Sequence, residues 1–166
     1  RDENAARRLL ADPGYLRFAV LREPFDRLVS AYLEKFVVNR HGAGNRETAR
    51  PVVAAVQGVP PAEADFETGI TFRQFAEFIL AATGWLDPHW CPQSDYLAEV
   101  PLGRLYTMEG LDLLQRDLTR HCGEAVRIDH ANRSREGRLE TVPGAADRTP
   151  AELAREARRL SSASFF

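Results

Sequence analysis

The amino-acid sequence predicts an α/β protein with a three-layer α/β/α architecture and a parallel sheet. A short apolar run over residues 15–21 is followed at once by an amphipathic helical pattern over 24–37. A second apolar run over 104–108 is followed by another helical pattern over 109–121. Strands that alternate with helices are typical of α/β domains whose strands run parallel. The 166 residues are close to the usual size of one domain, so we expect a single domain over 1–166.

The first elements are defined by turn residues at their ends. Residues 3–11 have a helical pattern, and Asp12-Pro13-Gly14 ends it. Residues 15–21 are rich in aromatic and branched side chains, which predicts a buried strand. Pro24 suits the first position of a helix, where a missing N–H costs nothing. One apolar stripe follows at spacings of three and four, formed by Phe25, Leu28, Val29, Tyr32, Leu33, Phe36 and Val37.

The middle of the chain has a different composition. Residues 39–69 are rich in Gly, Pro, Asn, Glu and Thr, and we interpret them as a surface excursion with one short helix near 51–57. Thr71 is a predicted N-cap for a helix that Gly84 ends. Residues 85–101 contain three prolines and two tryptophans and are predicted to be a loop. The apolar side of the helix after Thr71 consists of Phe72, Phe75, Phe78, Ile79 and Ala82.

The last third of the chain predicts two helices. The helix over 109–121 turns three leucines inward and ends at Gly123. Residues 125–128 are predicted to form a last strand, and residues 133–148 have a disordered-looking composition. The capping box over 149–152, with proline at the first helical position, predicts a C-terminal helix.

Composition and charge exclude some functions. The apolar share is 44% and the charged share 28%, as in ordinary soluble globular proteins. The net charge of −2 gives no attraction to nucleic acid or to an anionic membrane, so anion binding must come from local arginines. Lys35 is the only lysine. The arginine bias suits phosphate recognition and follows equally well from a GC-rich coding sequence.

The two cysteines and the histidines show no metal-binding spacing. Cys91 and Cys122 make neither a disulfide framework nor a zinc site. We expect both cysteines to be reduced; a single disulfide bond between them is the alternative. No apolar run approaches the ~18 residues that a membrane-spanning helix needs, so we expect no membrane segment.

The strongest chemical signal lies over residues 18–32. Arg22 stands where a strand ends and a helix begins. Ligands gather at the carboxyl ends of parallel strands, and helix N-termini favour phosphate. Ser30 lies on the polar face of the helix, roughly 12 Å along its axis at ~1.5 Å per residue, a gap that an arginine side chain and a phosphate can bridge. We expect Arg22 and Ser30 to bind one anion; a surface ion pair of Arg22 beside an exposed Ser30 is the alternative.

The segment FAVLREPFDRLVSAYLEKF resembles the donor-binding segment of the carbohydrate sulfotransferases, sulfotransferase family 2. That family has Arg-Asp-Pro-Phe-x-Arg-Leu-Val-Ser-Ala-Tyr after an apolar strand, and this chain departs from it only at Glu23. The resemblance implies that Arg22 and Ser30 hold the 3′-phosphate of 3′-phosphoadenosine 5′-phosphosulfate (PAPS). It also implies a P-loop-NTPase-like sulfotransferase fold. Weaker similarities follow in order as TFRQFAEFIL, DPHWCPQSDYL, RLYTMEGLDLLQRDL and HANRS, so the resemblance spans roughly residues 15 to 134.

The resemblance also implies a P-loop-like element that cradles the 5′-phosphosulfate upstream of Arg22. The 21 residues before Arg22 contain no such loop. We therefore expect a sulfotransferase domain that is incomplete at its N-terminus; a degenerate paralogue is the alternative.

The implied reaction moves a sulfuryl group from PAPS to a hydroxyl, expected to belong to a carbohydrate. It needs in-line placement, cationic stabilisation of the leaving phosphate and a base, and we expect no metal. His89 is the candidate base, because it lies in a loop and histidine titrates near neutrality; a structural role, or a base elsewhere, is the alternative. Trp90 could stack on a sugar, and Gln93 could bind the acceptor or orient His89.

Further residues carry weaker signals. Arg27 could face the nucleotide, but an ion pair with Glu23 or Glu34 is favoured. Three late residues could close over the 3′-phosphate or adenine, with a plain turn equally expected: Asn132, Arg133 and Ser134. His41, His121 and His130 have no partner pattern and are expected at the surface.

A second hypothesis is a non-catalytic remnant domain that binds adenosine 3′,5′-bisphosphate or a protein partner. A P-loop kinase is disfavoured because no Gly-x-x-x-x-Gly-Lys loop is present. We expect a cytoplasmic bacterial protein, with the lumenal domain of a Golgi membrane protein as the alternative. The sequence indicates neither the acceptor nor the oligomeric state.

Overall fold

The computed structural model of the protein describes residues 3–82, 87–97, 101–129 and 142–162. The chain divides into two compact units. The first unit is Arg1–Pro24 with Pro92–Asn132, and the second is Phe25–Cys91 with Arg133–Phe166. The expectation of a single domain over the whole chain stays a prediction.

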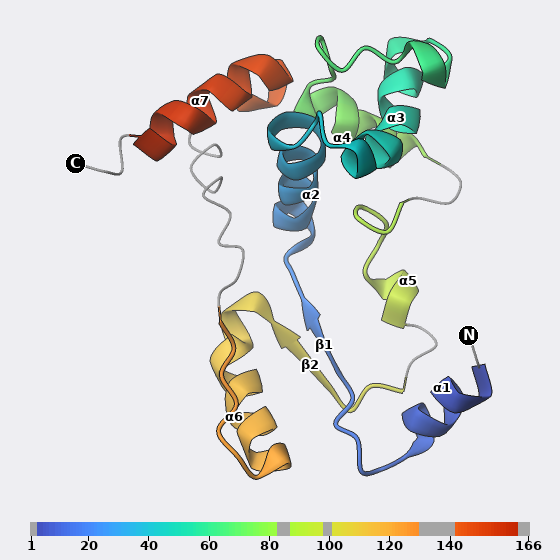
Figure 1. Ribbon diagram of the computed structural model, residues 1–166, viewed down its shortest axis with the longest axis vertical. Coiled ribbons are helices and arrows are strands. Elements are labelled where there is room, and N and C mark those ends of the chain that lie inside the picture. The colour runs from blue at the N-terminus through green and yellow to red at the C-terminus, as the bar shows by residue number, and fades with distance from the viewer. Residues whose placement is uncertain (1–2, 83–86, 98–100, 130–141, 163–166) are drawn as a thin grey trace. The chain divides into compact units, whose positions relative to one another are not determined.

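The first unit contains a parallel sheet. Strands β1 (Phe18–Leu21) and β2 (Arg104–Thr107) pair in parallel, with Phe18 opposite Arg104 and Leu21 opposite Thr107 (Figure 1). Both predicted strands and their parallel direction are confirmed. In the described part of the chain the sheet has only these two strands, and β1 is half-buried rather than fully buried. The helix-rich α/β character is therefore observed, whereas the three-layer arrangement stays a prediction.

The helices of the first unit begin and end near the predicted residues. Helix α1 (Glu3–Ala11) ends at Asp12, whose carboxylate accepts the N–H of Gly14 at 2.8 Å. A single 3-10 turn over Met108–Gly110 leads into α6 (Leu111–Cys122), which ends at Gly123 with φ 74°. Within the predicted loop, α5 (Ser94–Leu97) is one short helical turn.

A buried carboxylate fixes α6 to β2. Asp117 is only 7% exposed and accepts hydrogen bonds from the Tyr106 hydroxyl at 2.7 Å and from Arg120 at 3.0 Å. The Arg104 guanidinium donates to the same carboxylate. The hydrogen bond from Tyr106 and these two guanidinium groups hold the pKa of Asp117 below its usual range, against the effect of burial.

The prediction of a strand over residues 125–128 is wrong. The Val126 N–H donates to Thr119 Oγ1 at 3.1 Å, and the Ile128 N–H donates to Gln115 Oε1 at 2.9 Å. Both acceptors are side chains of α6. These backbone donors are therefore bound to a helix surface and form no strand ladder.

The second unit is built around the predicted amphipathic helix. Helix α2 (Pro24–Tyr32) continues as a π-helical segment, Leu33–Val38. Four of its apolar side chains are in the core: Tyr32, Leu33, Phe36 and Val37. The predicted stripe is thus confirmed, although its first member, Phe25, is 59% exposed.

Helix α3 (Ala43–Gln57) is longer than the short helix expected near 51–57. Its buried side chains are Ala49, Val52, Val53 and Ala54. Residues 43–57 therefore contribute to the core, contrary to the expectation of a surface excursion over residues 39–69. Pro51 and Gly44 weaken the intrinsic helical signal, and packing of the apolar face outweighs that weakness.

Helix α4 (Phe72–Ala81) begins at the predicted N-cap Thr71, which proves to be part of a capping box, and α7 (Pro150–Ser162) begins at the predicted capping box over 149–152. Thr71 Oγ1 accepts the Gln74 N–H at 3.2 Å, and Gln74 Oε1 accepts the Thr71 N–H at 2.8 Å. Glu152 likewise accepts the Thr149 N–H at 2.8 Å. The core of this unit is strongly aromatic, and Phe75 at its centre is fully buried.

Candidate functional site

Arg22 follows β1 directly, at the carboxyl end of the strand. The Gln93 side chain binds its backbone twice: Oε1 accepts the Arg22 N–H at 3.0 Å, and Nε2 donates to the Arg22 carbonyl at 2.7 Å. Within the part of the chain that the structure describes, the Arg22 guanidinium has no hydrogen-bond or ion-pair partner. The residue thus combines a fixed backbone with an unpaired cation, which is what an anion site requires.

Ser30 belongs to α2 and is half-buried. Among the described residues its hydroxyl has no hydrogen-bond partner. Arg22 lies in the first unit and Ser30 in the second. Their binding of one common phosphate therefore stays a prediction.

His89 is paired with a carboxylate two residues before it. Asp87 Oδ1 accepts the His89 backbone N–H at 2.9 Å and lies 2.5 Å from His89 Nδ1. Since an ionised carboxylate only accepts hydrogen bonds, this contact requires a proton on Nδ1, and whenever the ring is neutral Nε2 is the acceptor. The His89 side chain is 47% exposed, so Nε2 is within reach of a ligand. Sequence reasoning missed Asp87, although an Asp two residues before a backbone N–H is the spacing of an Asx turn.

Arg27 holds the loop that carries this pair. Its Nη1 donates to the Cys91 carbonyl at 2.6 Å, and its Nη2 donates to the Pro88 carbonyl at 2.7 Å. The ion pair favoured between Arg27 and Glu23 or Glu34 is therefore wrong, because the guanidinium binds loop carbonyls instead. A direct contact of Arg27 with the nucleotide stays a prediction.

Trp90 and Gln93, both expected to contact the acceptor, make contacts within the protein. Trp90 is 6% exposed and packs against Phe36 and Phe75, with ring centroids 6.0 Å and 5.5 Å away. Its indole ring belongs to the core and offers no free face for a sugar. Both polar groups of the Gln93 amide bind the Arg22 backbone, which gives this side chain a role in fixing Arg22; its contact with an acceptor or with His89 stays a prediction. Asn132, Arg133 and Ser134 lie outside the described residues.

The remaining titratable residues show no second cluster of this kind. His41 and His121 are exposed as expected, and His130 lies outside the described residues. Among the described residues, Cys91 and Cys122 are not joined by a disulfide bond. A search of the described residues finds no group of His, Cys, Asp or Glu side chains that could hold a metal ion. In the same part of the chain, no helix has the length and apolar character needed to cross a membrane.

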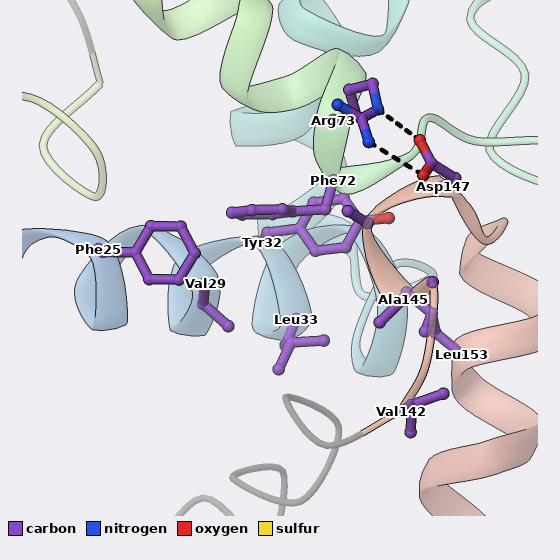
Figure 2. A pocket seen from close by; sticks show the side chains of 12 residues that line it. Phe25, Val29, Tyr32, Leu33, Phe72, Arg73, Val142, Ala145, Asp147 and Leu153 are labelled. Atoms are coloured by element: carbon purple, nitrogen blue, oxygen red, sulfur yellow. Dashed lines mark hydrogen bonds and ion pairs between the residues drawn. The ribbon is translucent and has the colours of Figure 1, made fainter.

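An apolar pocket of about 350 Å³ lies within the second unit (Figure 2). One side is formed by α2 and the segment after it, and another by residues 142–147 and α7. Arg73 and Asp147 form a two-point ion pair at its edge, with Nε–Oδ1 2.5 Å and Nη2–Oδ2 3.0 Å (Figure 2). The main lining side chains are Phe25, Val29, Tyr32, Leu33, Phe72, Val142, Ala145 and Leu153.

The pocket offers apolar surface rather than reactive groups. The Tyr32 hydroxyl donates to the Ile70 carbonyl at 2.8 Å, and burial raises the pKa of this phenol. The hydrogen bond from Arg73 holds the pKa of Asp147 below its usual range, so the edge of the pocket keeps a closed ion pair. Among the described residues, the polar groups that suit catalysis are the guanidinium of Arg22 and the hydroxyl of Ser30, which have no partner there, and the imidazole of His89, which Asp87 pairs on one side.

The described residues combine a parallel pair of strands with helices, as α/β proteins do. The model of the sulfotransferase family matches residues 3–157. The chain belongs to the sulfotransferase family, which confirms the resemblance seen in its sequence. Searches of curated proteins and of solved structures found no significant match.

Proposed function

We propose that this sulfotransferase uses PAPS as its donor and transfers the sulfuryl group to a hydroxyl of a carbohydrate. The observation that carries the proposal is the Arg22 guanidinium, which has no partner among the described residues and stands on a backbone fixed by Gln93. The carbohydrate acceptor is supported by the resemblance of the segment over residues 18–36 to carbohydrate sulfotransferases.

Arg22 and Ser30 bind the 3′-phosphate of the donor in this proposal. A phosphate supplies the partner that the Arg22 guanidinium lacks, because the planar fork of an arginine can donate two parallel hydrogen bonds to it. The Ser30 hydroxyl donates a further hydrogen bond from α2. Asn132, Arg133 and Ser134 are proposed to close over the same end of the nucleotide.

His89 is the proposed general base. The acceptor oxygen attacks sulfur while its proton passes to His89 Nε2, and the bond from sulfur to the bridging oxygen of the 5′-phosphate breaks. Adenosine 3′,5′-bisphosphate leaves with the electron pair of that bond. Stabilisation of the leaving phosphate requires cationic or N–H donors, as in phosphoryl transfer.

Nucleotide binding is tested by thermal unfolding with adenosine 3′,5′-bisphosphate. At a ligand concentration of 100 times Kd, binding adds about 2.7 kcal/mol, which corresponds to a rise in Tm of roughly 5–10 °C for a chain of this size. Arg22→Ala abolishes the rise and Ser30→Ala reduces it, whereas Arg116→Ala, an exposed arginine of α6, leaves it unchanged.

Two outcomes contradict the proposal. Equal stabilisation by adenosine 5′-monophosphate means that the 3′-phosphate is not recognised. An unchanged rise in Arg22→Ala means that this cation does not bind the ligand. Binding without transfer of labelled sulfuryl from PAPS to any hydroxyl favours the non-catalytic alternative.

A further inference from the structure

The loop over residues 87–91 carries the exposed imidazole of His89. Arg27 binds the loop at the Pro88 and Cys91 carbonyls, and Asp87 binds the imidazole itself. We infer that Asp87 and Arg27 are positioning residues for His89, an inference that rests on the proposed sulfotransferase function. Asp87 fixes the ring and its tautomer, and Arg27 fixes the loop to α2.

Asp87 controls the orientation of the His89 ring and selects its tautomer. One carboxylate oxygen accepts from the backbone N–H at 2.9 Å and from Nδ1 at 2.5 Å, so rotation of the ring would break the second bond. The Asp87 side chain is 22% exposed, less than half the exposure of the histidine. A partly shielded carboxylate on Nδ1 leaves Nε2 on the opposite side of the ring as the atom that accepts a proton.

Arg27 holds the loop on both sides of the histidine. The carbonyls that it binds belong to Pro88 and Cys91, which flank His89 and Trp90 in the chain. Trp90 is anchored in the aromatic core, so His89 is the exposed residue between fixed neighbours. A guanidinium can bridge two carbonyls with its fork of N–H groups, whereas a lysine ammonium cannot reproduce that geometry.

The same helix carries the proposed phosphate contact. Arg27 and Ser30 are three residues apart in α2, a spacing that puts side chains on adjacent turns of one helix face. The loop with the base is therefore attached to the helix that contributes Ser30. This attachment fixes His89 relative to a residue of the donor site through contacts within one unit.

Asp87→Asn and Arg27→Lys test the inference with small changes in shape. Both are expected to lower kcat at least about 10-fold, with the KM for PAPS and the stabilisation by adenosine 3′,5′-bisphosphate unchanged. His89→Ala gives the full decrease in kcat that loss of the base causes. The double variant Asp87→Asn with His89→Ala is expected to have the same kcat as His89→Ala alone, because the effects of residues that act as a unit are not additive. Glu67→Gln is the matched control, since Glu67 lies 3.7 Å from the exposed His41 and is expected to change nothing.

The imidazole ¹⁵N chemical shifts of His89 provide a readout that does not depend on turnover. The intact protein is expected to show the tautomer protonated on Nδ1, and Asp87→Asn a mixture of both tautomers. A wild-type ring protonated on Nε2, or an Asp87→Asn variant with unchanged shifts and unchanged kcat, overturns the inference. If adenosine 3′,5′-bisphosphate does not raise the Tm of the wild-type protein, the proposed function itself fails. The Tm assay therefore separates that failure from a failure of the inference about Asp87 and Arg27.

Discussion

Gly69 allows α7 to pack closely against the turn that precedes α4. Its φ is 63°, in the left-handed region, and a Cβ at this position would lie 2.6 Å from Pro150 Cγ and 3.2 Å from Pro150 Cδ. Pro150 is fully buried and begins α7, so its ring has no room to move away. Gly69→Ala is therefore expected to destabilise the second unit in two ways.

The magnitude follows from these two effects. A left-handed conformation costs about 1–2 kcal/mol for a residue with a side chain, and overpacking in a core costs about 1–3 kcal/mol. Their sum, roughly 2–5 kcal/mol, is a large part of the ~5–15 kcal/mol by which proteins of this kind are stable. We expect a marked fall in the midpoint of urea unfolding followed by circular dichroism, with an unchanged m-value.

Gly58→Ala is the matched control for this experiment. Gly58 has φ 69°, and no heavy atom lies within 4 Å of the Cβ that it would acquire. It therefore reports the cost of the left-handed conformation alone, about 1–2 kcal/mol. Equal destabilisation by the two substitutions would refute the close contact between Gly69 and Pro150.

Three further predictions concern single contacts. The pKa of Asp117 is lowered in the folded protein, chiefly by Tyr106, so its stabilising effect is present above the unfolded pKa of ~3.9 and is lost as pH falls through the folded value; Asp117→Asn should flatten the dependence of the urea midpoint on pH below about 4. Gln93→Ala leaves the Arg22 N–H and carbonyl without their partners and should cost about 1–3 kcal/mol in urea unfolding, with a smaller rise in Tm on adding adenosine 3′,5′-bisphosphate; full retention of both would contradict the role given to Gln93. Thr71→Ala removes the cap of α4 and should cost about 1 kcal/mol in the same unfolding assay, whereas Thr71→Ser should cost much less.

Local signals in the sequence were sufficient for most elements. Pro24, the spacing of apolar side chains after it and the capping boxes at Thr71 and Thr149 each act within one or two helical turns. The strands over 18–21 and 104–107 were also predicted from short apolar runs. These elements could be predicted because their cause lies in neighbouring residues.

The errors in the fold arose where distant residues decide the structure. Helix α3 is stabilised by burial of Val52 and Val53 in a core that its own sequence does not reveal. Residues 125–128 have the composition of a strand, but side chains of α6 bind their backbone donors. Neither the burial of helix α3 nor the binding of residues 125–128 to α6 can be inferred from the ten or so neighbouring residues in the sequence.

In the candidate site, too, local sequence signals identified some residues, whereas contacts between distant residues could not be predicted. Arg22, Ser30 and His89 could be proposed from residue type and position, because each lies in or beside a predicted element. The contact between Arg27 and Cys91 joins residues 64 positions apart, so no local pattern indicates it. Trp90 was misinterpreted because residue type does not reveal whether an aromatic ring lies in the core or at the surface.

The two bonds from Arg27 have a mechanical consequence. A loop tied to a helix through both of its flanking carbonyls cannot swing away alone, and a helical turn cannot stretch without losing its own hydrogen bonds. Helix α2 and residues 88–91 are therefore expected to move together as one rigid piece of the second unit.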